Sequence, residues 1–166
     1  LTQCKDDNSS PLLDALIAPK VSLTFATENN TFSFSEVKTT NDEANPTFID
    51  LNGNLTKDAG EELKPLKEYR ASTKNVTIFG HINSLLLTGQ KSLTTIEVQN
   101  RFIQTLKVTN CSSLTNCKII KANSLEVIDI SGSESVENIE LSTNENFIKE
   151  LHEVVMTNPK LIGTKN

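Results

Sequence analysis

One short unit occurs twice in almost the same form, as Ser92-Leu93-Thr94-Thr95-Ile96-Glu97-Val98 and as Ser113-Leu114-Thr115-Asn116-Cys117-Lys118-Ile119. Its pattern, apolar-x-x-apolar-x-apolar, is typical of a short strand whose alternate side chains point to one face. Six copies follow one another at near-constant spacing, a regularity that chance does not explain. The copies are Ile82/Leu85/Leu87, Leu93/Ile96/Val98, Ile103/Leu106/Val108, Leu114/Cys117/Ile119, Leu125/Ile128/Ile130 and Val136/Ile139/Leu141.

Polar turns rich in Asn, Ser, Gly and Thr separate the copies. One unit cannot bury its apolar face alone, whereas units stacked about 4.8 Å apart form a continuous core. We expect odd and even copies on opposite walls, so that a full coil takes about 21–22 residues, a length typical of leucine-rich repeats. The 3–4 residue spacing of apolar residues over 144–158 favours a helix or one longer repeat arm, and this segment is the expected cap.

The repeats resemble the internalin-like leucine-rich-repeat proteins of the Bacteroidetes. Their coils alternate a Leu-x-x-Leu-x-Cys strand with a Leu-Thr-x-Leu-Asp-Val-Ser strand, which Leu125-Glu126-Val127-Ile128-Asp129-Ile130-Ser131 echoes. Upstream, Phe48-Ile49-Asp50-Leu51-Asn52-Gly53-Asn54 and Val76-Thr77-Ile78-Phe79-Gly80 resemble the small domain that precedes those repeats. The resemblance covers roughly residues 20–166, and it implies a short solenoid that acts as an adhesion or interaction module.

The segment before the repeats reads as a small β domain that covers the first coil. Asn/Asp/Thr-rich turns separate its short apolar runs, and shielding an open sheet edge prevents aggregation. The overall prediction is a mainly β chain: a signal remnant and tether over 1–19, a small β capping domain over 20–80, and a leucine-rich-repeat solenoid with its cap over 81–166. The expected strands of the β domain are Val21–Phe25, Thr31–Val37, Thr47–Leu51, Glu68–Ser72 and Val76–Phe79.

Oxygen-bearing side chains in this domain follow the spacing of a calcium-binding loop. Positions one, three, five, seven, nine and twelve of such a loop ligate the ion, with a bidentate Glu at the last. Position six, normally Gly, is Leu55, and no flanking helix is evident before Asp50. A structural calcium and an Asx-rich loop whose side chains bond their own backbone are therefore both open. The candidate ligands are Asp50, Asn52, Asn54, Thr56, Asp58 and Glu61.

The first residues, Leu1-Thr2-Gln3-Cys4, resemble the end of a bacterial lipoprotein signal peptide. Lys5-Asp6-Asp7 then resembles the acidic tag that sends Bacteroidetes lipoproteins to the outer face of the outer membrane. The position before Cys4 departs from the family, which usually has Gly or Ala where Gln3 stands. The resemblance implies acylation at Cys4 and a cell-surface location, with the lipid as the membrane contact. The alternative is an incidental cysteine in a polar terminus.

One strand wall is the candidate partner-binding surface, because repeat proteins bind through such faces. Its central column reads Glu97, Lys118, Glu140, so the charges alternate in sign. A cross-strand charge ladder is the alternative reason for these charges, and each exposed pair then contributes a few tenths of a kcal/mol at most. The outward residues of this wall are Thr95, Glu97, Gln99, Asn116, Lys118, Ile120, Asn138, Glu140 and Ser142.

Nothing in the motif content predicts catalysis. Neither a nucleophile elbow, a zinc-protease helix nor a phosphate-binding loop occurs, and His81 and His152 read as surface residues. Cys111 and Cys117 read as buried small apolar residues rather than as a redox pair. A net charge of −5 argues against nucleic-acid binding.

We therefore expect a monomeric, non-enzymatic surface lipoprotein that requires no cofactor. Its expected partner is a protein at the cell surface. The alternative is an accessory glycan-binding lipoprotein of an uptake complex.

Overall fold

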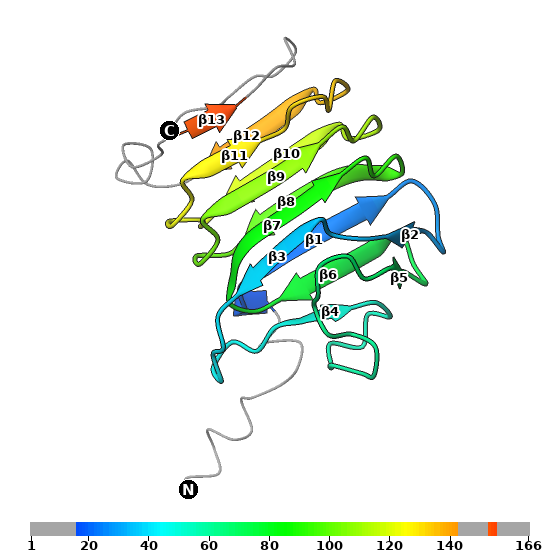
Figure 1. The fold of residues 1–166 in the computed structure, drawn as a ribbon, viewed down its shortest axis with the longest axis vertical. Helices are drawn as coiled ribbons and strands as arrows, with labels where there is room; N and C mark the ends of the chain where they lie inside the picture. The colour runs from blue at the N-terminus through cyan, green and yellow to red at the C-terminus, as the bar shows by residue number, and fades with distance from the viewer. Residues whose placement is uncertain (1–15, 143–152, 156–166) are drawn as a thin grey trace, which may run out of the picture.

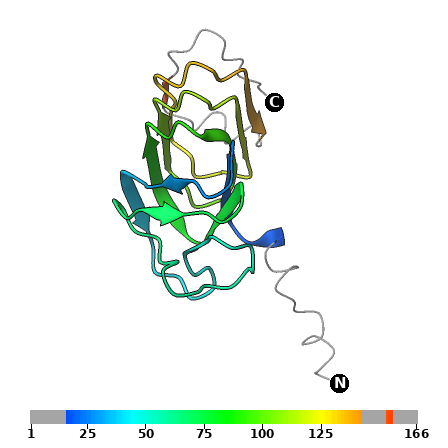
Figure 2. The same cartoon turned by 90° about the vertical axis from the view of Figure 1, so that its right-hand side faces the viewer.

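The computed structural model describes residues 16–142 and 153–155. Within these residues the fold is mainly β, with two large sheets and one two-stranded sheet. The two large sheets face each other across a shared core (Figures 1 and 2). No helix in this part of the chain combines the length and the apolarity needed to cross a membrane.

The larger sheet has the strand order β12-β10-β8-β1-β6-β4. Its strands β8, β10 and β12 are parallel, and Ile96 pairs with Cys117, which pairs with Ile139. Each step between these partners spans two successive copies of the unit, which agrees with the expected length of one coil. The strands are β1 Lys20–Phe25, β4 Phe48–Asp50, β6 Asn75–Phe79, β8 Leu93–Gln99, β10 Asn116–Ile120 and β12 Asn138–Ser142.

The second sheet has the strand order β13-β11-β9-β7-β3. Here β7, β9, β11 and β13 are parallel, and Leu85 pairs with Leu106, which pairs with Ile128. Alternate copies of the unit therefore fall in opposite sheets, because neighbouring copies are joined by a turn rather than by a ladder. The strands are β3 Glu36–Thr39, β7 Ile82–Thr88, β9 Thr105–Thr109, β11 Val127–Asp129 and β13 Glu153–Val155.

The apolar positions of all six units point into the space between the sheets. Each of the residues in these triplets is at most 7% exposed, the largest value belonging to Leu141 near the end of the described part. Fully burying one such aliphatic side chain stabilises the fold by about 1.5–3 kcal/mol. The inward pattern read from the sequence is therefore confirmed.

N-terminal strands continue both large sheets. β1 lies antiparallel between β8 and β6, and β3 lies antiparallel beside β7. The first parallel strand of each sheet is thus paired on its outer side, and the buried apolar residues of the segment 20–80 belong to the same cluster as those of the repeats. The division of the chain near residue 80 stays a prediction.

The strand expected over Thr31–Val37 is divided in two. β2 (Thr31–Phe32) pairs with β5 (Tyr69–Arg70), whereas β3 pairs with β7. Phe34 lies between them, is fully buried, and meets Phe32 and Tyr69 edge-on. With this ring buried, the chain passes from the small sheet at β2 to the large sheet at β3. The alternation of polar and apolar residues does not predict this change of sheet.

The C-terminal segment is described only at Glu153–Val155. These residues form β13 and pair in parallel with β11, so they are a strand and not part of a helix, and the longer repeat arm stays a prediction. The remainder of 144–158, His152 included, lies outside the described residues.

Candidate functional site

The predicted partner-binding residues stand in three aligned rows on β8, β10 and β12. The register places Glu97 beside Lys118 and Lys118 beside Glu140. The outer rows join Thr95 to Asn116 and Asn138, and Gln99 to Ile120 and Ser142. The face is therefore continuous across three strands, although Ser142 is placed here only by its backbone.

Charges in the central row are not joined in ion pairs. No nitrogen–oxygen contact of 4 Å or less links Lys118 to Glu97 or Glu140, whereas such contacts occur elsewhere in the described residues. Glu140 is exposed, and Glu97 and Lys118 are half-buried. Neighbouring opposite charges still attract across the ladder, but an exposed pair contributes only about 0.2–1 kcal/mol. The charges thus stay available to a partner.

An open depression of about 650 Å³ lies over these rows. Its lining includes Thr95, Glu97, Asn116, Lys118, Asn138 and Glu140. In one outer row the Asn138 amide donates to the Asn116 side-chain oxygen over 3.0 Å. The side chains beside the charges are therefore partly ordered, which lowers the entropy lost on binding.

β1 extends the same face, which the sequence reading did not include. Ser22 pairs with Glu97 and Lys20 with Gln99. Burial lowers the pKa of Lys20, the Glu97 carboxylate opposes that shift, and Lys121 adds to it. The alternation of polar and apolar residues in Lys20–Phe25 indicates that one side of this strand faces outward. It does not indicate that the strand lies beside β8.

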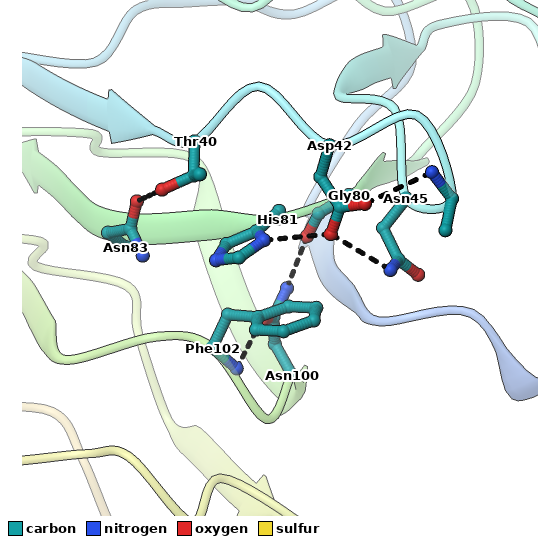
Figure 3. Close-up of polar contacts among 9 residues, drawn as sticks. Thr40, Asp42, Asn45, Gly80, His81, Asn83, Asn100 and Phe102 are labelled. Atoms are coloured by element: carbon teal, nitrogen blue, oxygen red, sulfur yellow. Dashed lines mark hydrogen bonds and ion pairs between the residues drawn. The ribbon is translucent and has the colours of Figure 1, made fainter.

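His81 is the centre of a second polar cluster, at the junction between β6 and β7. Its Nδ1 lies 2.9 Å from Asp42 Oδ2, and its ring stacks on Phe102 with centroids 3.7 Å apart (Figure 3). The hydrogen bond with His81 is the main cause that lowers the pKa of Asp42, and one from Asn45 also contributes. His81 is thus a half-buried partner of an aspartate that is distant in the sequence, and not the plain surface residue that we expected.

The Asp/Asn loop forms the hydrogen bonds of the Asx-rich alternative. Asp50 accepts the backbone N–H groups of Gly53 and Leu55, and Glu61 accepts those of Leu51 and Asp58, all at 2.8–3.0 Å. Asn52, Asn54 and Thr56 bond within the loop and to Asp58. No group of three or more acidic, His or Cys residues within the described ranges is arranged to hold a metal. Calcium binding stays a prediction.

The buried Asp50 carboxylate gives a test of this loop. We expect Asp50→Ala to lower the free energy of unfolding by about 2 kcal/mol, because two backbone donors lose their acceptor. Urea unfolding should show the same loss in a chelator and in excess calcium. Lys57→Ala, at an exposed position of the same loop and outside the candidate ligands, is the control and should cost about 0.5 kcal/mol or less. A loss confined to calcium buffer would instead assign the Asp50 carboxylate to the ion.

Cys111 and Cys117 are both free and buried, as the sequence reading expected. Burial raises the pKa of Cys117 to about 12, and it raises that of Cys111 as well. A thiol that stays neutral is a poor nucleophile, so these two cysteines act as core residues. Cys4 lies outside the described residues.

At alkaline pH, the raised pKa of Cys117 should make the free energy of unfolding depend on pH. Above pH 9 the unfolded chain ionises this thiol, while the folded chain keeps it neutral to about pH 12, so the free energy of unfolding falls as pH rises. Cys117→Ala should make that fall less steep between pH 9 and 11, measured by urea unfolding. The raised pKa of Tyr69 acts in the same direction and leaves a residual slope in the variant. Identical slopes for both proteins would contradict this prediction.

The chain was compared with protein-family models, curated proteins and solved structures. No family model, no curated protein and no solved structure matches the chain. The two polar clusters and the sheet register are therefore the features of this chain that bear on its function.

Proposed function

We propose that this chain is a non-enzymatic cell-surface interaction module that binds a protein partner through the face of β8, β10 and β12. The observation that carries the proposal is the alignment of three outward rows, polar except at Ile120, on neighbouring strands, with no ion pair among the central charges. An open face with alternating charge can fix the register of a partner of opposite pattern.

The architecture in this proposal is a short leucine-rich-repeat solenoid. Parallel pairing of alternate units in two sheets, with one coil between paired strands, supports it. Each coil then contacts only its neighbours, so that the outward residues form a regular array. Rigid strands hold these residues in place, which suits recognition without any bond being made or broken.

Anchoring through a lipid on Cys4 is part of the same proposal, and it rests on the lipoprotein-like start of the sequence. Metabolic labelling with a radioactive fatty acid tests it. Fatty-acid label in the parent protein and none in the Cys4→Ser variant would support acylation at Cys4. An unlabelled parent protein would contradict it. A lipid on Cys4 would attach the module to a membrane, and the Lys5-Asp6-Asp7 tag is the feature that points to the outer-membrane surface.

Inverting the charge pattern of the face tests the binding proposal. The triple variant Glu97→Lys, Lys118→Glu, Glu140→Lys keeps the signs alternating along the ladder, so we expect its stability to change by about 1 kcal/mol or less. Capture of a surface protein by the parent from envelope or host-matrix extracts should fall at least tenfold. A partner identified by mass spectrometry then allows the affinities to be measured directly.

Lys107→Glu, on β9 of the opposite sheet, is the matched control. Its side chain is half-buried like that of Lys118, and it also lies in the middle of a parallel strand. Binding retained by this control and lost by the triple variant locates the face. Equal binding by the parent and the triple variant would contradict the proposed site.

Glycan binding is the second candidate, favoured by the row of Thr95, Asn116 and Asn138. Hydroxyl and amide groups in an open depression can bond sugar hydroxyls in both directions. A glycan array separates the two candidates. Sugar-specific signal that Asn116→Ala abolishes would favour the accessory glycan-binding role over adhesion to protein.

A further inference from the structure

A second cavity, of about 740 Å³, opens at the β4–β6 end of the large sheet, on residues that the proposed function does not use. Separate segments of the chain line it: residues 17–19, 44–46, 55–56 and 79–80, together with Phe48 and Arg101. Its apolar lining includes the side chains of Ile17, Pro46, Phe48, Leu55 and Phe79.

Aromatic rings form one wall of this cavity. Phe48 and Phe79 are cross-strand neighbours on β4 and β6, and their rings stack with centroids 5.1 Å apart. Phe79 is nearly buried and Phe48 half-buried, while Ile17 is 73% exposed at the opening. An apolar ligand placed here would cover the exposed Ile17 side chain, and its own apolar surface would also be removed from water.

The rim is held by hydrogen bonds centred on Gly80 and His81. The Gly80 N–H donates to the Pro19 carbonyl, the Gly80 carbonyl accepts from the Asn100 side chain, and the His81 N–H donates to the Asn45 carbonyl, at 3.0–3.1 Å. Figure 3 shows Gly80, Asn45 and Asn100 gathered around His81. Because these bonds tie the lining segments together, the cavity is preformed.

Arg101 supplies a cation at the edge of the cavity. Its guanidinium lies 4.4 Å from the centroid of the Phe102 ring, which in turn stacks on His81. No ion pair joins Arg101 to any acidic side chain among the residues that the structure describes. A guanidinium binds carboxylates well because its planar N–H groups match their oxygens.

We propose that this cavity binds a small amphiphile with an apolar body and a carboxylate head. The body packs on Phe48 and Phe79, and the head meets Arg101. This site is separate from the β8-β10-β12 face, so it stands or falls independently of the proposed function. The chain carries a net charge of −5, so the overall field repels anions and any preference for one must arise locally.

Titration of the isotope-labelled full chain with octanoate and with octanol tests the proposal by NMR. The two probes share one apolar body and differ in the charge of the head. We expect shifts at the amides of Phe48, Leu55, Phe79 and Gly80, and about fivefold tighter binding of octanoate, the upper range for an exposed ion pair. Arg101→Gln should bring the two affinities together.

Arg70→Gln is the matched control, because Arg70 is also exposed but donates to the Asn29 carbonyl on the small sheet. This variant should keep the preference for octanoate. Shifts at other residues, no binding of either probe, or equal affinities in the parent would each overturn the proposal. A preference that Arg101→Gln leaves unchanged would overturn the role of Arg101.

Discussion

Gly80→Ala is expected to lower the free energy of unfolding by about 3–5 kcal/mol, through backbone strain and overpacking together. The φ of Gly80 is +116°, where L residues are strained, and a Cβ would lie 2.5 Å from the Pro46 carbonyl oxygen and from Thr47 Cα. Both contacts are with backbone, so no side-chain rotation relieves them. Urea unfolding followed by circular dichroism measures the loss.

Gly89→Ala is the control for this substitution. Gly89 also has a positive φ, +66°, but no atom lies within 4 Å of the added Cβ. The expected loss is only the cost of the left-handed backbone, about 1–2 kcal/mol. Equal losses for the two variants would mean that the loop at 44–47 moves freely, which would contradict the close packing at Gly80.

Asn100→Ala is the second large prediction, with an expected loss of about 3 kcal/mol from one buried and one partly buried hydrogen bond. Asn100 is fully buried, its amide donates to the Gly80 carbonyl, and its oxygen accepts the Phe102 N–H at 3.0 Å. Removing the side chain leaves both backbone groups without this partner. Thermal unfolding should show a correspondingly lower midpoint.

Asn116→Ala controls for the loss of an asparagine from the same sheet region. Its side chain is half-buried and bonds only to the polar side chains of Thr115 and Asn138 among the described residues. We expect a loss of about 0.5 kcal/mol, because water can replace those partners. If Asn100→Ala were equally mild, the Gly80 turn would not depend on the buried amide.

The repeat region was predictable because its information is local and periodic. Each unit carries its own alternation, so Ile96 and Val98 share one apolar face of their strand, and burial of that face turns it toward the core. The constant spacing then sets which residues become neighbours, and Glu97, Lys118 and Glu140 did align. Stacking in register buries every apolar triplet at once, whereas a slip by one residue would expose them all.

Four of the five strands expected in the N-terminal segment match strands of the structure and the fifth is divided into β2 and β3, but the sequence predicted none of their partners. The residues Lys20–Phe25 do not predict that this strand pairs with both β8 and β6, because both partners lie far away along the chain. The same holds for Asp42 and His81, which meet only because β3 pairs with β7 and brings the following turn alongside. These pairings do not recur at a fixed spacing in the sequence, so no periodic pattern predicts them.

The two-sheet stacking of the repeats, their inward residues and the outward face of β8, β10 and β12 followed from alternation and spacing, which are properties of neighbouring residues. The positions of β1 and β3 in those sheets, and the cavity that Gly80 and Asn100 hold beside Arg101, could not be predicted in this way. Those features depend on packing between distant segments, whose energy is set by shape and hydrogen bonding in three dimensions.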